Sequence, residues 1–130
     1  MSPEFPSNIC FYIKVTPEPS FEYQVLEKEW TKTHLPDFYW YDLDNFSEGV
    51  VVDYALQMLQ QAQNILLIIK AEPNSPLGGI LKIIPQLHRS KSQIKVIFQG
   101  DHAQLQKMLK PLNQLLINPL EAEMQSFVMF

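Results

Sequence analysis

Apolar residues in this chain alternate between short unbroken runs and longer stretches in which they recur at helical spacing. The unbroken runs are rich in β-branched and aromatic residues, which is typical of strands; they cover 9–15, 38–41, 65–69, 94–98 and 115–117. Between them, apolar residues three and four positions apart are typical of helices that bury one face. The pattern therefore predicts five strand–helix units in succession.

Small polar residues before the helical stretches predict where the helices begin, because their side chains can accept hydrogen bonds from first-turn amides. The predicted caps are Ser20, Ser47, Ser75, Asp101 and Asn118. Pro76 and Pro119 fit the first helical position, which needs no amide hydrogen. Pro85 lies inside the third helical stretch and is expected to kink or shorten that helix.

The second helix carries the clearest apolar stripe in the chain. The stripe comprises Val50, Val51, Tyr54, Ala55, Met58, Leu59 and Ala62. The run 65–69 that follows is apolar at every position, as expected for a central strand covered on both faces. The last segment fits a helix through Met124, Phe127 and Val128, and a short strand within 124–130 is the alternative.

The order of elements predicts the fold. Helices long enough to cross from strand to strand require parallel pairing and right-handed crossovers. The expected fold is α/β: a three-layer, doubly wound parallel five-stranded sheet in the flavodoxin-like order 2-1-3-4-5. A chain of 130 residues with 46% hydrophobic and 18% charged residues fits a single domain over 1–130, beginning with a flexible segment at 1–7.

Charge and cysteine content narrow the class of protein. The formal net charge is −4 and the basic residues are scattered, which argues against a nucleic-acid surface because such surfaces gather Lys and Arg against phosphates. The single cysteine, Cys10, lies in an apolar run and is expected to be buried rather than reactive. No apolar run is long enough to span a membrane, and we expect a cytoplasmic protein.

In a sheet of this kind, ligands bind beyond the carboxyl ends of the strands, near the point where the strand order reverses. The loop after the second strand carries Asp42 and Asp44, carboxylates that can bind a divalent ion or share a proton, or that form a solvated turn. No histidine lies near them in sequence, so we expect no metal site built on histidine ligands.

The third and fourth loops supply the other candidate residues. Lys70, Ser75 and Gly78 surround a predicted helix start that can accept an anion, while close helix packing explains the glycine equally well. His102 follows Asp101, a pair that suggests acid–base chemistry, whereas a histidine in a first helical turn is more often a surface residue.

Several well-known cofactor motifs are missing. The chain has four glycines and no glycine-rich phosphate loop, and its first loop, 16–20, places two prolines where backbone amides would hold a phosphate. The phosphoacceptor aspartate of a response-regulator receiver domain is also missing, because the third strand ends in Lys70-Ala71-Glu72. We therefore expect no cofactor and no phosphorelay.

Residues 36–72 resemble the middle of a Toll/interleukin-1-receptor (TIR)-type domain. An aromatic strand end, 38–42, leads through a glycine-containing loop and an amphipathic helix into the apolar strand 65–69. The resemblance implies a scaffold used for self-association or, in some members, for cleaving NAD. The NAD-cleaving members place a glutamate on the helix after the third strand, and the segment 76–87 has no acidic residue. The resemblance thus implies the scaffold without the catalysis.

These features predict a non-enzymatic protein-interaction module that self-associates as a homodimer or binds another protein. The motivation is the apolar chain end 127–130, which must be buried in its own fold or in a partner. The alternative is small-molecule or nucleotide binding, with or without enzymatic activity, at the carboxyl ends of the strands. The residues for that alternative are Asp42, Asp44, Lys70, Ser75, Gly78 and His102.

Overall fold

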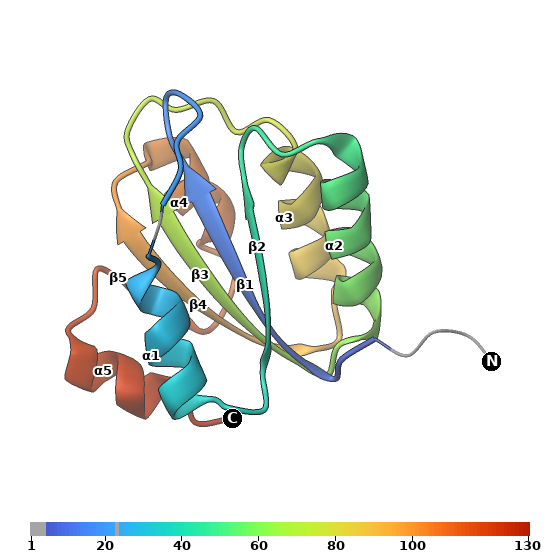
Figure 1. The fold of residues 1–130 in the computed structure, drawn as a ribbon, viewed down its shortest axis with the longest axis vertical. Coiled ribbons are helices and arrows are strands. Elements are labelled where there is room, and N and C mark those ends of the chain that lie inside the picture. The colour runs from blue at the N-terminus through green and yellow to red at the C-terminus, as the bar shows by residue number, and fades with distance from the viewer. Residues whose placement is uncertain (1–4, 23) are drawn as a thin grey trace.

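The computed structural model describes residues 5–22 and 24–130, in which strands and helices alternate from one end to the other (Figure 1). The strands are β1 Asn8–Val15, β2 Tyr39–Asp44, β3 Asn64–Ala71, β4 Gln93–Gly100 and β5 Leu115–Ile117. The helices are α1 Leu26–His34, α2 Gly49–Gln61, α3 Ile80–Arg89, α4 Ala103–Leu109 and α5 Glu121–Phe127.

All five strands run parallel in the order β2-β1-β3-β4-β5, which confirms the predicted doubly wound, flavodoxin-like sheet. The order reverses at β1, because the chain crosses from β1 to β2 on one side and then returns to β3 on the other. Strands β1, β3 and β4 pair along their whole length, whereas β5 pairs with β4 over only three residues. The two edges of the sheet are β2 and β5.

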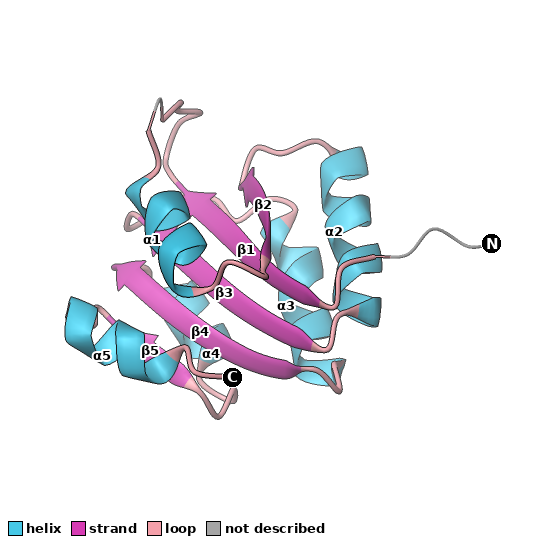
Figure 2. Cartoon of the chain, turned by 60° about the horizontal axis from the view of Figure 1, so that its bottom comes forward, coloured by secondary structure: helices cyan, strands magenta, loops and turns pink. Residues whose placement is uncertain are grey.

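Helices cover both faces of the sheet (Figure 2). The larger core lies under α2, α3 and α4, and a smaller one lies under α1 and α5. Alternate residues of the run 65–69 enter the two cores in turn, so every residue of that run is buried. This confirms the expectation that β3 is a central strand covered on both faces.

The predicted N-caps are wrong for all five helices, and the side chains of Ser47 and Ser75 bond within the loops instead. The observed N-caps are Val25, Glu48, Gly79, His102 and Leu120. The Ser47 hydroxyl accepts from the Asp44 amide at 2.9 Å, and the Ser75 hydroxyl donates to the Glu72 carbonyl at 2.9 Å. Helix α3 therefore starts later than predicted and runs through Pro85 to Arg89.

The predicted stripe of α2 is confirmed in part, because Ala55, Met58, Leu59 and Ala62 are buried but Val52 takes the place expected of Val50 and Tyr54. Val52 is 1% exposed, whereas Val50 and Tyr54 are 70% and 44% exposed. Val52 packs against Gly79 at the start of α3, where a Cβ would lie 2.7 Å from the valine methyl group. Val52 therefore lies on the side of α2 that meets α3, and Val50 and Tyr54 lie on the surface.

The chain end forms helix α5, so the alternative of a terminal strand is wrong. Lys95 of β4 holds this end, since its Nζ donates to the carbonyls of Phe127 at 2.6 Å and Met129 at 2.5 Å. Val128 is buried in the smaller core, and the Phe130 ring lies 5.0 Å from the Phe38 ring. The fold therefore covers only part of the apolar tail, because Val128 is buried whereas Met129 and Phe130 are 76% and 38% exposed.

The beginning of the described chain contacts the larger core. Of the segment 1–7 predicted to be flexible, residues 1–4 lie outside the described residues. The Phe5 ring lies 5.5 Å from the Tyr54 ring, and the Ser7 carbonyl accepts from the amides of Gln63 and Asn64.

Candidate functional site

Polar side chains gather at the carboxyl ends of β1 and β2, on the side of the sheet that α1 covers. Tyr12 and Lys14 of β1 stand in register with Asp42 and Asp44 of β2. With the loop that follows β1, these residues line a groove of about 330 Å³. Asp42 and Asp44 belong to β2 itself, because this strand extends three residues beyond the predicted end.

Two ion pairs neutralise the lysines of this region. Lys14 Nζ lies 2.9 Å from Glu22 Oε1, and Lys70, its register partner on β3, lies 3.4 Å from Glu27 Oε1. The Tyr12 hydroxyl donates to Glu22 at 3.0 Å. Burial alone would raise the pKa of Glu22, but hydrogen bonds from Lys14 and Tyr12 and the charges of both lysines lower it. Burial and the nearby carboxylates raise the pKa of Tyr12.

The carboxylates of β2 have different surroundings. Asp42 accepts a hydrogen bond from Trp40 Nε1 at 3.0 Å and remains exposed. Asp44 Oδ1 accepts from the Phe46 amide at 2.7 Å and from the Ser47 hydroxyl at 3.3 Å. Asp44 therefore forms a turn, one of the two predicted alternatives. Among residues 5–22 and 24–130, no three His, Cys, Asp or Glu side chains are placed to hold a metal ion.

His102 is a buried helix cap, not the surface residue that sequence reasoning favoured. Its Nδ1 accepts a hydrogen bond from the Leu105 amide at 3.2 Å, so its Nε2 carries the proton and donates to the Ser75 carbonyl at 2.8 Å. Its own amide donates to Gln106 Oε1 at 3.1 Å. Because both ring nitrogens are occupied, His102 has a structural role, and Asp101 is not the cap of α4.

Asn45 ties the loops after β1, β2 and β3 together and was not a predicted site residue. Its side chain accepts from the Thr16 amide at 3.2 Å and donates to the carbonyls of Thr16 at 2.8 Å and Pro76 at 2.5 Å. Gly78 adopts a φ of 53°, and a Cβ there would lie 2.1 Å from the Asn45 carbonyl oxygen. The glycine is thus required by a close backbone approach, which is the packing explanation considered from the sequence.

The predicted site residues consequently fall into two separate sets. Asp42 and Asp44 line the groove, and Lys70 stands on the same face of the sheet two strands away. Ser75, Gly78 and His102 belong to the hydrogen-bonded loops on the α3 and α4 side. The fold does not bring the six residues into one site.

A second hollow, the α1–α5 crevice, lies between those two helices on the same face of the sheet. Its volume is about 340 Å³. Its floor is Ile68 of β3 and Ile97 of β4, and its walls include Trp30 of α1 and Met124 of α5. Gln99, near the carboxyl end of β4, adds a polar side chain to the lining.

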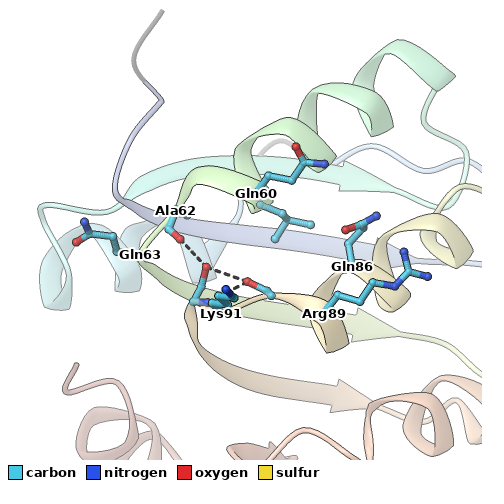
Figure 3. Close-up of a pocket in the computed structure, with 9 residues that line it drawn as sticks. Gln60, Ala62, Gln63, Gln86, Arg89 and Lys91 are labelled. Carbon is cyan, nitrogen blue, oxygen red and sulfur yellow. Dashed lines mark hydrogen bonds between the residues drawn. The ribbon is translucent and has the colours of Figure 1, made fainter.

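A third hollow, of about 490 Å³, lies at the opposite end of the molecule, where α2 and α3 end (Figure 3). Gln60, Gln86 and Arg89 stand around it. The Ser92 hydroxyl beneath them donates to the Ala62 carbonyl at 2.5 Å and also receives a hydrogen bond from Ser90. These serines fix the turn before β4, and Arg89 lies at the C-terminus of α3, where a cation is favoured by the helix dipole.

The outer side of β2 and α2 carries an exposed apolar surface, here called the aromatic edge, which consists of Tyr39, Tyr41, Val50 and Tyr54. Tyr39 is 48% exposed, and it alternates with Tyr41 on the same face of β2. The Tyr41 ring lies 5.8 Å from the Tyr54 ring, and Val50 is one helical turn from Tyr54. The four side chains therefore form a continuous surface beside the open edge of the sheet.

Comparison of the chain with protein-family models, with curated proteins and with solved structures finds no match. The resemblance of residues 36–72 to TIR-type domains therefore stays a prediction. In the part of the chain that the structure describes, no helix is both long and apolar enough to cross a bilayer.

Proposed function

We propose that this domain is a non-enzymatic interaction module that self-associates through its aromatic edge, and that it acts in the cytoplasm without binding nucleic acid. The observation that supports the proposal is the aromatic edge itself. Single exposed apolar residues are ordinary on a protein surface. A continuous group of them beside an open strand is typical of a surface that binds another protein.

The backbone of β2 offers a second means of binding. The Asn45 amide donates to the Lys14 carbonyl of β1, whereas the Asp44 amide points away from β1 to the Ser47 hydroxyl. Backbone groups of successive strand residues point to opposite sides. Trp40 and Asp42, which share the direction of Asp44, therefore turn their N–H and C=O groups toward the open edge of the sheet.

A second copy of β2 fits this edge in an antiparallel arrangement with two-fold symmetry. If Tyr41 lies on the axis, Trp40 of one copy forms a hydrogen-bonded pair with Asp42 of the other, and each carboxylate faces an indole. Shifting the axis to Asp42 would place two carboxylates directly opposite each other, which is unfavourable. Two-fold dimers are the most common homo-oligomers, and this arrangement joins two sheets into one.

The experiment is light scattering of the full chain over a wide concentration range, comparing wild type with Tyr54→Glu. A glutamate at this exposed position places charge in the proposed interface while leaving the core intact. We expect the wild-type mass to rise to that of a dimer, and Tyr54→Glu to weaken dimerisation by about tenfold or more.

Leu120→Glu is the matched control, because Leu120 is also a large exposed hydrophobic residue, 72% exposed, but lies after β5, near the other edge of the sheet. It should dimerise as wild type does. A wild-type chain that stays monomeric throughout the range contradicts the proposal. Equal loss of dimer in both variants would contradict the location of the interface.

A second candidate function is small-molecule or nucleotide binding in the groove at the carboxyl ends of β1 and β2. The observation in its favour is the polar lining of that groove, which includes Lys14, Glu22, Asp42 and Asp44. Carboxylates outnumber lysines there, which favours a cationic or metal-complexed ligand over a free phosphate. A thermal-shift screen of metals and nucleotides tests it, since a ligand at a hundredfold its Kd stabilises by about 2.7 kcal/mol.

A further inference from the structure

The hollow where α2 and α3 end, here called the α2–α3 hollow, is open to a small ligand. Its volume of about 490 Å³ falls within the usual range for ligand pockets, roughly 300–1,000 Å³. Of its polar lining, Gln60, Arg89 and Lys91 are exposed and Gln86 is half-buried. Figure 3 shows that Gln60, Gln86 and Arg89 stand around the hollow. A ligand that enters from solvent therefore meets amide groups and cations.

The turn beneath the hollow is fixed by its own hydrogen bonds. The Ser90 hydroxyl donates to the Ser92 hydroxyl, which donates to the Ala62 carbonyl. The Ser92 amide donates back to the Ser90 hydroxyl. These groups hold α2, α3 and the start of β4 together, so the ligand-binding groups around the hollow stand on a rigid base, which lowers the entropy cost of binding.

The amides and cations around the hollow have no partner in the described chain. No hydrogen bond or ion pair among residues 5–22 and 24–130 involves the side chains of Gln60, Gln86, Arg89 or Lys91. The lysines near the carboxyl ends of β1 and β3 differ, because each is paired with a glutamate. The two cations of the α2–α3 hollow are thus available to a ligand.

The surroundings of the hollow are positive in a chain whose net charge is −4. No acidic residue occurs in 54–71 or 73–100, the segments that form most of α2 and all of β3, α3 and β4. Glu72 and Asp101 follow β3 and β4, at the carboxyl ends of the strands, whereas the hollow lies at the amino ends. Among the described residues, no acidic side chain lines the hollow. An anion is therefore attracted to it.

The donors around the hollow favour a carboxylate with hydroxyl groups over a phosphate. Arg89, the only arginine of the chain, carries a planar guanidinium that can bond a carboxylate through two parallel N–H groups. Phosphates are commonly held by amides at a helix N-terminus, but α2 and α3 end here and present carbonyls. The amides of Gln60 and Gln86 both donate and accept, which suits hydroxyl groups. Gln86 is one helical turn from Arg89, so both can contact one ligand.

We propose that the α2–α3 hollow binds a small hydroxycarboxylate with two carboxylate groups. One carboxylate would accept from Arg89 and the other from Lys91, and the hydroxyl groups between them would bond Gln60 and Gln86. This inference is independent of self-association, which uses β2 and the beginning of α2. It is also independent of the groove at the carboxyl ends of β1 and β2, because the hollow lies at the opposite end of the sheet.

The experiment is an NMR titration of the full chain, at constant ionic strength, with the matched probes tartrate, succinate and threitol. Succinate is tartrate without its hydroxyl groups, and threitol is tartrate with both carboxylates reduced to alcohols. We expect tartrate to move the side-chain amide signals of Gln60 and Gln86 in a saturable way. Succinate and threitol should each bind about tenfold or more weakly, because each lacks one of the two kinds of contact.

Two variants locate the binding. Arg89→Gln removes the guanidinium at an exposed position of the hollow. Lys82→Gln is the matched control, because it makes the same change of charge at an exposed position of the same helix that does not line the hollow. Tartrate should bind Arg89→Gln about tenfold or more weakly, and should bind Lys82→Gln as it binds wild type.

Three results would each overturn the proposal. The first is a tartrate titration that moves neither glutamine signal at any concentration. The second is binding of succinate or threitol to the wild-type chain that is as tight as that of tartrate, a comparison that does not depend on any variant folding. The third is equal tartrate binding by folded Arg89→Gln and Lys82→Gln chains.

Discussion

Among single residues, Asn45 does most to fix the carboxyl end of the sheet, because one buried amide bonds backbone groups of two other loops. We predict that Asn45→Ala lowers the free energy of unfolding by about 2–3 kcal/mol, since it leaves the Thr16 amide and carbonyl and the Pro76 carbonyl without this partner. Urea unfolding measures the change. Asn45→Asp, which keeps only the acceptor, should also be destabilised, and a loss below about 0.5 kcal/mol in both variants would refute this role.

The burial of Cys10 makes the folding stability of the chain depend on pH. Burial raises the pKa of Cys10 from 9.0 to about 12, partly offset by the contact with the Thr31 hydroxyl. Between these values the folded chain keeps the thiol proton and the unfolded chain loses it, so folding stability should fall as the pH rises above 9.0. We predict a smaller fall in Cys10→Ala, measured by urea unfolding across this range. An identical fall in both chains would contradict the assignment.

The burial and role of a single residue could be predicted from the sequence only where its neighbours along the chain determine them. Cys10 was expected to be buried because its neighbours in sequence are apolar, and it is. His102 was expected on the surface because a histidine in a first helical turn is more often exposed. Its burial depends on the Ser75 carbonyl, which is far away in sequence. Asn45 was missed as a site residue for the same reason, since it sits in no motif and its bonds to the Thr16 and Pro76 backbone arise only from the folded packing.

Among the elements, α5 is held by a buried cation, Lys95, in addition to the apolar contacts of Met124 and Phe127 with the smaller core. Lys95 donates to two carbonyls at the end of α5, and its Nζ lies 4.7 Å from the centre of the Phe130 ring. We predict that Lys95→Met speeds amide hydrogen exchange across 121–130 by about tenfold, because a hydrogen bond from a charged donor contributes about 1.5–3 kcal/mol. Lys82→Met, on an exposed position of α3, is the control. Unchanged exchange in 121–130 would show that Lys95 does not hold the helix.

Strands could be predicted better than helix boundaries, and the reason is physical. A central strand such as β3 is apolar at every position, a pattern that few alternatives explain. A helix start depends on which nearby group a serine or asparagine bonds, and Ser47 and Ser75 bond the loop backbone instead. The local period of α2 predicted the burial of Ala55, Met58 and Leu59, but the burial of Val52 against Gly79 depends on α3, which lies farther along the chain.

For the whole molecule, the doubly wound sheet followed directly from the alternation of elements, and its strand order is as predicted. Which of the candidate site residues lie together could not be predicted from that alternation. Six candidates at strand ends were expected to approach one another, but the sheet separates Asp42 from His102 by placing their side chains on different sides. The aromatic edge, which carries the self-association proposal, arises from the packing of α2 beside β2, and the sequence pattern did not reveal it.

The most direct test of self-association is residue-resolved amide hydrogen exchange of the full chain at low and high protein concentration. Trp40 and Asp42 turn their amides to the open edge, while those of Tyr41 and Leu43 face β1, so the two pairs provide an internal comparison within one strand. We predict that protection of Trp40 and Asp42 rises with concentration, with little change at Tyr41 and Leu43. Exchange at Trp40 and Asp42 that is independent of concentration would contradict pairing through β2.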